Sequence, residues 1–300
     1  MKHGIALTVL VLGALAGPPD VPTPNAPGPE WKALDDILGP GREAPGGVRR
    51  YGWPRRDLEV SVRGVRIEAA LALGSWAAFA PPGPSGDTMA MGDLVLLASE
   101  VNPVLASLQK DGLEVLAIHN HLIDETPRLV YVHFGGHDSA IRLGRGLAAA
   151  LGRTKTPTSP APASGAGPSP EEEKIFEAIQ KALGRKGSLA GRVLQVGVPR
   201  AQPIEEAGRE VPPSMGVATA LNFQVDGPRV LATGDFVLLA DEVNPVVEQL
   251  QKHSIDVTAL HSHMLRETPR LFFLHFWASG PPETVSAGLA AAISKTTSRP

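Results

Sequence analysis

The chain contains an internal repeat long enough to be a whole domain. Residues 92–134 and 234–276 align without a gap at a constant offset of 142, and 25 of the 43 aligned positions are identical. GDLVLLASEVNPV in the first matches GDFVLLADEVNPV in the second, and HNHLIDETPRL matches HSHMLRETPRL. Self-similarity at this level indicates duplication of one folding unit, so the sequence predicts a domain of roughly 120 residues used twice.

Two proline-rich stretches delimit the copies. Residues 154–170 read TKTPTSPAPASGAGPSP, which has no hydrophobic periodicity, so we expect an inter-domain linker there. Residues 17–29 are similarly rich in proline and predict an extended tether. The first copy is then expected over 30–153 and the second copy over 171–297.

The N-terminus has the features of a secretory signal peptide. Lys2 and His3 precede an apolar run from Ile5 to Ala16, which ends in the small-x-small pattern of a cleavage site. The run is shorter than the roughly 20 apolar residues that a membrane-spanning helix needs, and no later stretch is long and apolar enough. The sequence therefore predicts a signal peptide over 1–16 and an exported protein, periplasmic or secreted, with no transmembrane segment.

Composition excludes several classes of function. The chain has no cysteine, so it has no disulfide framework, no thiolate metal site and no cysteine nucleophile. Its formal net charge of -3 provides no basic surface for nucleic acid. It also has no phosphate-binding loop, no dinucleotide glycine fingerprint and no nucleophile elbow, so no nucleotide cofactor is expected.

Each copy has the pattern of an α+β domain. A short helix comes first, several strands follow, and a closing helix ends the copy, so we expect two tandem copies of a mainly antiparallel sheet with flanking helices. Gly92-Asp93 is expected to start a strand after a turn. Asn102-Pro103 is expected to begin a helix, because asparagine is a good N-cap residue and proline fits the first turn.

Six of the nine histidines form two matching triads. The triads are His119, His121 and His133 in the first copy, and His261, His263 and His275 in the second copy. Histidines two residues apart on a strand share one face. If the strands on either side of Thr126 form a hairpin, His119 lies opposite His133 and His121 lies opposite Tyr131. Three imidazoles then converge on one patch in each copy.

Converging imidazoles are typical of a transition-metal site, with zinc or copper as the first candidates. Glu125 and Glu267, four residues past the second histidine of each triad, are candidates for a fourth ligand or a catalytic base. Glu100 and Glu242 are weaker candidates for the same roles, and His137 occurs in the first copy only. Arg128 and Arg270 are candidates for binding an anionic ligand.

Three functions fit these residues. The first is an exported protein that binds a divalent transition metal through the triads. The second is a metal-dependent hydrolase of the cell envelope, in which Glu125 or Glu267 activates a metal-bound water. The third is a non-catalytic module that binds an envelope polymer, a protein or a small molecule. The linker permits either two separate sites or one cleft that both triads share.

With EVNPV, the His-x-His segments, ETPRL and the HFW ending in place, the chain resembles the LppY/LpqO-like family of bacterial exported proteins. The resemblance implies a tandem domain of unknown function and export, and it implies no activity. Many members of that family are lipoproteins, whereas this chain has no cysteine to carry a lipid. The spacing of His133 and His137 also departs from the pattern of the family.

Overall fold

The computed structural model describes residues 29–159 and 167–299, together with Met1. The predicted signal peptide, nearly all of the predicted tether and the centre of the predicted linker lie outside these residues. No helix within the described part of the chain is long and apolar enough to cross a membrane.

The first copy contains four helices and nine strands among the described residues. In chain order they are α1 (Pro29–Leu38), β1 (Arg42–Ala44), β2 (Val48–Pro54), β3 (Ser61–Val62), β4 (Val65–Arg66), α2 (Ala69–Ala72), β5 (Gly74–Phe79), β6 (Thr88–Leu97), α3 (Ala98–Lys110), β7 (Glu114–His119), β8 (Glu125–Thr126), β9 (Leu129–Asp138) and α4 (Ala140–Leu151). Six strands form one antiparallel sheet in the order β1-β2-β5-β6-β9-β7, and the other three form a small sheet.

The second copy repeats this order, with a single turn of 3-10 helix in the place of α2. Its elements are α5 (Pro170–Leu183), β10 (Ser188–Ala190), β11 (Val193–Pro199), β12 (Glu205–Glu206), β13 (Arg209–Glu210), η1 (Pro213–Met215), β14 (Ala218–Asp226), β15 (Arg229–Leu238), α6 (Ala240–Lys252), β16 (Asp256–His261), β17 (Glu267–Thr268), β18 (Phe272–Gly280) and α7 (Pro282–Ile293). The main sheet has the order β10-β11-β14-β15-β18-β16. The predicted α+β class and the duplicated antiparallel sheet are confirmed.

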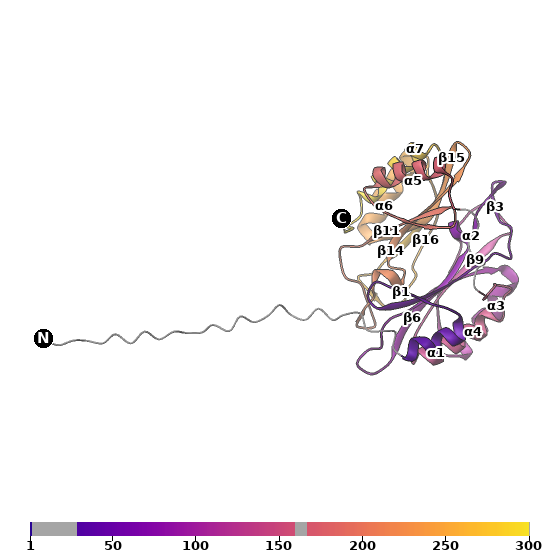
Figure 1. The fold of residues 1–300 in the computed structure, drawn as a ribbon, viewed down its shortest axis with the longest axis vertical. Coiled ribbons are helices and arrows are strands. Elements are labelled where there is room, and N and C mark those ends of the chain that lie inside the picture. Colours follow the sequence, from indigo (N-terminus) through magenta and orange to yellow (C-terminus); the bar gives the residue numbers. More distant parts are fainter. Residues whose placement is uncertain (2–28, 160–166, 300) are drawn as a thin grey trace.

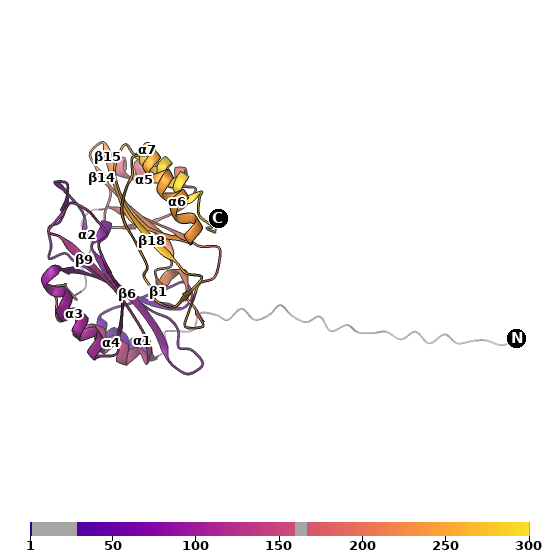
Figure 2. The ribbon, with the colours of Figure 1, turned by 180° about the vertical axis from the view of Figure 1, so that it is seen from behind.

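The two copies pack as four layers, with the sheets inside and the helices outside (Figure 1). Helices α1, α3 and α4 cover the outer face of the first sheet, and α5, α6 and α7 cover the outer face of the second. The same layers are seen from behind in Figure 2. Each outer face is apolar for this reason: Leu94, Val132 and Phe134 pack under the first set of helices, and Phe236 and Leu274 under the second.

The inner faces of the two sheets enclose two mixed cores. One joins Met89 and Met91 of the first copy to Val237 and Phe273 of the second copy. The other core combines Val95, Leu129 and Tyr131 from the first copy with Val193, Leu231 and Trp277 from the second. Because both cores draw on both copies, the two domains bury their inner faces against each other.

Each copy also sends a segment across the sheet of the other. Asn222 and Gln195 donate side-chain hydrogen bonds to the carbonyls of Leu71 and Ala70, which tie α2 to the second sheet at 2.9 and 3.1 Å. In the opposite direction, Arg50 of the first copy donates to the carbonyl of Ser214 in η1. These reciprocal contacts fix the relative position of the copies.

Two predicted element starts are wrong. Strand β6 begins at Thr88, so Asp93 lies in the middle of a central strand and does not follow a turn. Helix α3 begins at Ala98, and Pro103 lies inside it. The carboxylate of Glu100 accepts a hydrogen bond from the Leu97 amide at 2.8 Å, which caps the helix four residues earlier than Asn102.

The predicted histidine register is also wrong. His119 pairs with Tyr131, two residues from its predicted partner, and Ala117 pairs with His133; the ladder also has a one-residue shift between Val115 and Ala117. The second copy has the same shift, with His261 opposite Phe273. The connection is also longer than a tight hairpin, since β8 pairs with β3 of the small sheet.

Candidate metal centre

The two histidine triads form one cluster between the sheets. His119 stacks on His261 with ring centroids 3.5 Å apart, His121 on His275 at 3.8 Å, and His133 on His263 at 3.6 Å. Each of these pairs takes one ring from each copy. Of the two arrangements that the linker permits, the structure has the shared one.

Two aspartates complete the cluster, one from the middle of each central strand. The Asp93 carboxylate lies 3.5 Å from Nε2 of His121 and 3.7 Å from Nε2 of His133. The Asp235 carboxylate lies 3.5 Å from Nε2 of His263 and 3.9 Å from Nε2 of His275. Each aspartate is adjacent to its histidine on the sheet, because Asp93 pairs with His133 and Asp235 with His275.

Burial keeps the imidazoles neutral. Burial lowers the pKa of His119 to about 4 and that of His261 to about 3. Burial, followed by the neighbouring imidazoles, lowers the pKa of each of the other four rings well below the usual value. Neutral imidazole is the form that binds a metal ion, so the cluster is in that form at neutral pH.

The carboxyl groups are displaced in the opposite direction. Burial raises the pKa of Asp93 to about 8. The pKa of Asp235 also lies well above its usual value, through burial and through the charge of Asp93. No arginine or lysine contacts either carboxylate within the ion-pair distance among the described residues, so a cation bound here would provide the missing charge.

Many nitrogen and oxygen atoms in the cluster that could bind a metal ion have no hydrogen-bond partner. The buried side-chain atoms without one, over residues 29–159 and 167–299, include seven from this cluster. They are Oδ1 of Asp93 and of Asp235, Nε2 of His119, His121, His133 and His275, and Nδ1 of His261. Leaving a buried polar atom unpaired costs about 1–3 kcal/mol, so seven in one place require an explanation. All six imidazoles and both carboxylates belong to groups whose ligand atoms lie within 4.8 Å of one another.

Neighbouring side chains hold the rings in place. Tyr131 stacks on His121 with centroids 3.4 Å apart, and Phe273 stacks on His263 at 3.6 Å. The residue that follows β7 also contacts the other copy, because the Asn120 side chain donates a hydrogen bond to the carbonyl of Thr258 at 3.1 Å. The Gly234 carbonyl contacts Nδ1 of His275 at 2.9 Å, which leaves Nε2 of that ring free to face Asp235.

Glycine precedes each aspartate because the neighbouring strand comes very close. A Cβ at Gly234 would lie 1.9 Å from the Ala220 carbonyl oxygen. A Cβ at Gly92 would lie 2.4 Å from the Trp76 carbonyl oxygen and 2.4 Å from the Phe134 ring. Real Cβ contacts are not this short, so any larger residue would displace the strand that carries the aspartate.

Comparison with known families agrees with the duplication. Residues 32–153 and residues 177–295 each match the family described as Domain of Unknown Function (DUF1259). The chain belongs to this family. Its description assigns no activity, and no curated protein matches the sequence of this chain. The DUF1259 domain thus occurs here twice, and the histidine cluster combines residues of both copies.

Two solved structures show a weak likeness to the DUF1259 pair. One is a trimeric bacterial microcompartment shell protein, PduB, with 11% identity and a TM-score of 0.21; the match covers 85% of this chain and 89% of that chain. The other is EtuB from Clostridium kluyveri, with 10% identity and a TM-score of 0.20 over 85% of this chain and 88% of that chain. These scores are too low to indicate a shared fold.

The two glutamates proposed as ligands or bases begin the short strands β8 and β17, which follow the histidines. Glu125 accepts a hydrogen bond from the Leu129 amide at 3.2 Å, and Glu267 accepts one from the Leu271 amide at 2.9 Å. Both are buried. Neither belongs to the groups of close ligand atoms found among the described residues. Their assignment as catalytic bases stays a prediction.

The two arginines proposed to bind an anion are exposed. Arg270 donates to the carbonyls of Met264 and Leu265, both at 3.2 Å, and to the Glu267 carboxylate. Its guanidinium therefore holds its own turn together. His137 faces a different group, since its Nδ1 lies 3.9 Å from the Asp87 carboxylate.

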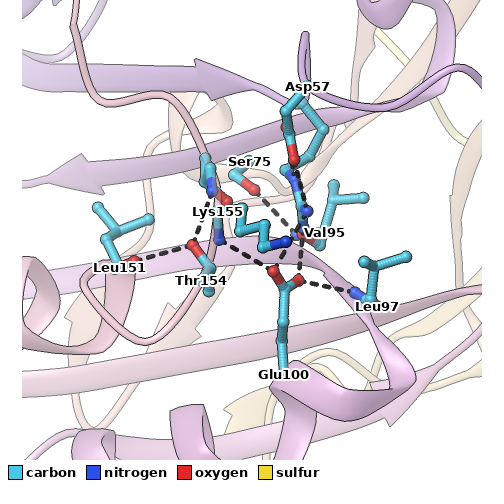
Figure 3. A network of polar contacts seen from close by, with 10 residues as sticks. Asp57, Ser75, Val95, Leu97, Glu100, Leu151, Thr154 and Lys155 are labelled. Atoms are coloured by element: carbon cyan, nitrogen blue, oxygen red, sulfur yellow. Dashed lines mark hydrogen bonds and ion pairs between the residues drawn. The ribbon is translucent and has the colours of Figure 1, made fainter.

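Glu100 and Glu242 each form a buried ion pair with an arginine. Arg55 donates to Glu100 at 2.7 Å and to Asp57 at 2.9 Å, and Glu100 also accepts from the Lys155 amide (Figure 3). Arg200 donates to Glu242 at 2.6 Å in the same way. These carboxylates connect the start of a helix, a strand and the segment after the closing helix, so their role is structural.

Sequence reasoning assigned Asp93 and Asp235 to strand starts and missed them as site residues. A usable signal is present, because each is the single charged residue inside a long apolar run, MAMGDLVLL and LATGDFVLL. An ionisable side chain that is retained in the middle of a buried strand, in both copies, indicates a site with a partner for its charge.

Proposed function

We propose that this protein binds a divalent transition metal, zinc or copper, in the cluster that the two copies form together. The observation that carries the proposal is the set of seven buried ligand atoms without partners, gathered in overlapping groups of close ligand atoms, two of which combine residues of both copies. A metal ion satisfies lone pairs of several imidazoles and carboxylates at once. A stack of purely structural histidines would leave those nitrogens unpaired at a considerable free-energy cost.

The donor set supports zinc or copper. Imidazole nitrogens are ligands for zinc, copper, iron and nickel, whereas calcium and magnesium prefer oxygen ligands alone. The carboxylates add one negative charge each to this largely neutral set. Burial raises the pKa of both carboxyl groups, and a bound cation favours the ionised carboxylate and offsets that burial.

Binding fits the site better than catalysis on a large substrate. The cavity beside His133 and His263 has a volume of about 10 Å³ and is otherwise lined largely by apolar side chains such as Met264 and Phe273. That volume accommodates about one water molecule. His133, His263 and His275 are each less than a tenth exposed, so an organic substrate has little access to them.

Elemental analysis of protein purified without chelators, and then incubated with Zn²⁺ or Cu²⁺ and desalted, tests the proposal. We expect at least one equivalent of metal in the wild type and a loss of most of it in His119→Ala/His121→Ala. His137→Ala is a matched control on the same strand as His133, and it should retain the wild-type amount. Less than one equivalent in the wild type, or no change in the double variant, contradicts metal binding.

We also propose that the chain is exported and, in line with its resemblance to the LppY/LpqO-like family, acts in the cell envelope. The support is the charged start, the apolar run and the small-x-small pattern within residues 1–16. N-terminal sequencing of the protein recovered from a bacterial periplasmic fraction tests this. A mature chain that starts at Gly17 supports export, and an intact Met1 in the cytoplasmic fraction contradicts it.

A further inference from the structure

The cluster contains two equivalent ligand sets, one from each copy. The first set is Asp93, His121 and His133, and the second is Asp235, His263 and His275. Residues of the same type occupy matching positions of the duplicated fold, and each set is held by its own central strand and by the strand next to it. A duplicated binding site holds a duplicated ligand unless the two sites are too close together to be filled at once.

We infer that the cluster is a dinuclear centre, with one metal ion on the Asp93 set and a second metal ion on the Asp235 set. This inference rests on the proposed metal binding and adds the number of ions and the ligands of each. Two-metal sites in proteins hold their ions about 3.5–4 Å apart, so two ions can share one small cluster.

The spacing of the ligand atoms agrees with one ion for each set. Zinc binds imidazole nitrogen at about 2.0–2.1 Å, so two ligand atoms of a tetrahedral site lie about 3.3–3.4 Å apart. The carboxylate of the first set lies 3.5 and 3.7 Å from its two imidazole nitrogens, and that of the second set lies 3.5 and 3.9 Å from its own. The first set, in which one oxygen of Asp93 makes both contacts, is therefore within a few tenths of an ångström of tetrahedral edges. In the second set the two imidazoles face different oxygens of Asp235.

The remaining histidine of each copy completes the corresponding set. The His119 ring lies 5.1 Å from His121 and 5.0 Å from His133, centroid to centroid. The His261 ring lies 4.8 Å from His263 and 5.0 Å from His275. Each copy thus brings three imidazoles and one carboxylate to the cluster, which is the four-ligand number that zinc prefers.

The two ions are coupled through the boundary between the copies. His119 and His261 stack on each other at 3.5 Å, and His119 also belongs to a group of ligand atoms with His133, His261 and His263. The two halves of the site are thus in direct contact. Filling both halves joins the copies through the metal centre, in addition to the apolar cores between the sheets.

Copper stoichiometry and electron paramagnetic resonance of the full-length protein loaded with Cu²⁺ test the inference. The wild type should bind two Cu²⁺ per chain and show the half-field signal of a coupled pair. Asp93→Asn and Asp235→Asn should each bind one Cu²⁺ and show the spectrum of an isolated ion, and the double variant should bind none. Asp226→Asn, at an exposed carboxylate of the second copy, is the control and should bind two.

The outcomes separate the inference from the proposed function. One ion in the wild type, lost equally in both single variants, overturns the dinuclear centre and leaves metal binding intact. Two ions retained in either single variant overturns the assignment of the carboxylates as ligands. No ion in the wild type overturns both proposals. If an aspartate variant does not fold by circular dichroism, the copy-specific pairs His121→Ala/His133→Ala and His263→Ala/His275→Ala provide the same comparison.

Discussion

The two copies of the domain keep the same candidate metal-site residues while their surroundings differ. In the first copy, Tyr131 stacks on the site and donates a hydrogen bond to the Ala72 carbonyl at 3.1 Å; in the second copy, Phe273 stacks in the same way without a hydroxyl. The buried arginine also differs, because Arg55 contacts a second carboxylate and Arg200 contacts an amide instead. The residues of the candidate centre are therefore the same in both copies, whereas the side chains that surround and support it differ between the copies.

The largest expected effect is the loss of the buried arginine. Arg55→Met leaves Glu100 and Asp57 without their cation, and Arg200→Met leaves Glu242. Removing one partner of a buried ion pair costs about 3–5 kcal/mol in the free energy of unfolding. We expect Arg55→Met to be the more destabilising variant, because it leaves two carboxylates without their cation, whereas Arg200→Met leaves one. Urea unfolding of both variants measures the difference, and an equal loss in the two would show that Asp57 contributes little.

Replacing the glycine before the aspartate should destabilise the protein in both copies, and by more in the second copy. Gly234→Ala places a Cβ almost on a backbone oxygen, whereas Gly92→Ala meets an oxygen and a ring edge at a longer distance. Overpacking of this kind costs about 1–3 kcal/mol, and occasionally more. Thermal unfolding should show the larger loss for Gly234→Ala. Gly197→Ala, in strand β11 with open space at the Cβ position, is a control that should change little.

The histidines at the boundary between the copies should not be equivalent. His119 lies within 5.5 Å of the rings of both His263 and His275 as well as near its own set, and it occurs in two groups of close ligand atoms. His261 occurs in one such group. We therefore expect His119→Ala to weaken Zn²⁺ binding by about tenfold, or 1.4 kcal/mol, and His261→Ala to weaken it by less. Titration against a chelating dye distinguishes them, and identical curves would contradict the asymmetry.

The sequence contains enough information for the repeat, the fold class and the six histidines, because these depend on local pattern and on matching spacing. It does not predict the register, because His119 pairs with Tyr131 and not with His133, and the connection between β7 and β9 contains β8, which pairs with β3 and not within a tight hairpin. It also does not predict that the triads meet. That depends on α2 and η1, short segments whose sequences differ between the copies and which attach each copy to the sheet of the other. Asp93 was placed wrongly because a glycine inside a strand resembles a turn until the close neighbouring strand is known.

The smallest effect concerns how each copy holds its first helix, and it depends on pH. Burial raises the pKa of Asp35 in α1, but hydrogen bonds from Arg49 and Tyr51 lower it by more, so it lies below the ordinary value of 3.8. Burial likewise raises the pKa of Glu172 in α5, and hydrogen bonds from Ser169 and Arg192 bring it below the ordinary value of 4.5. A carboxylate with a lowered pKa in the folded state stabilises the protein above its unfolded pKa, and this stabilisation is lost as the pH falls through the folded pKa.

The contribution of Glu172 should therefore begin to fade below about pH 4.5, and that of Asp35 below about pH 3.8. The difference in the free energy of unfolding between the wild type and Glu172→Gln should shrink first on acidification, while the difference between the wild type and Asp35→Asn should persist to lower pH. Urea unfolding from pH 3 to pH 7 measures both differences. If the difference for Asp35→Asn shrinks first on acidification, the prediction is wrong. In that case the additional hydrogen bond from Tyr51 does not strengthen the first copy, and the two carboxylates hold their helices with similar strength.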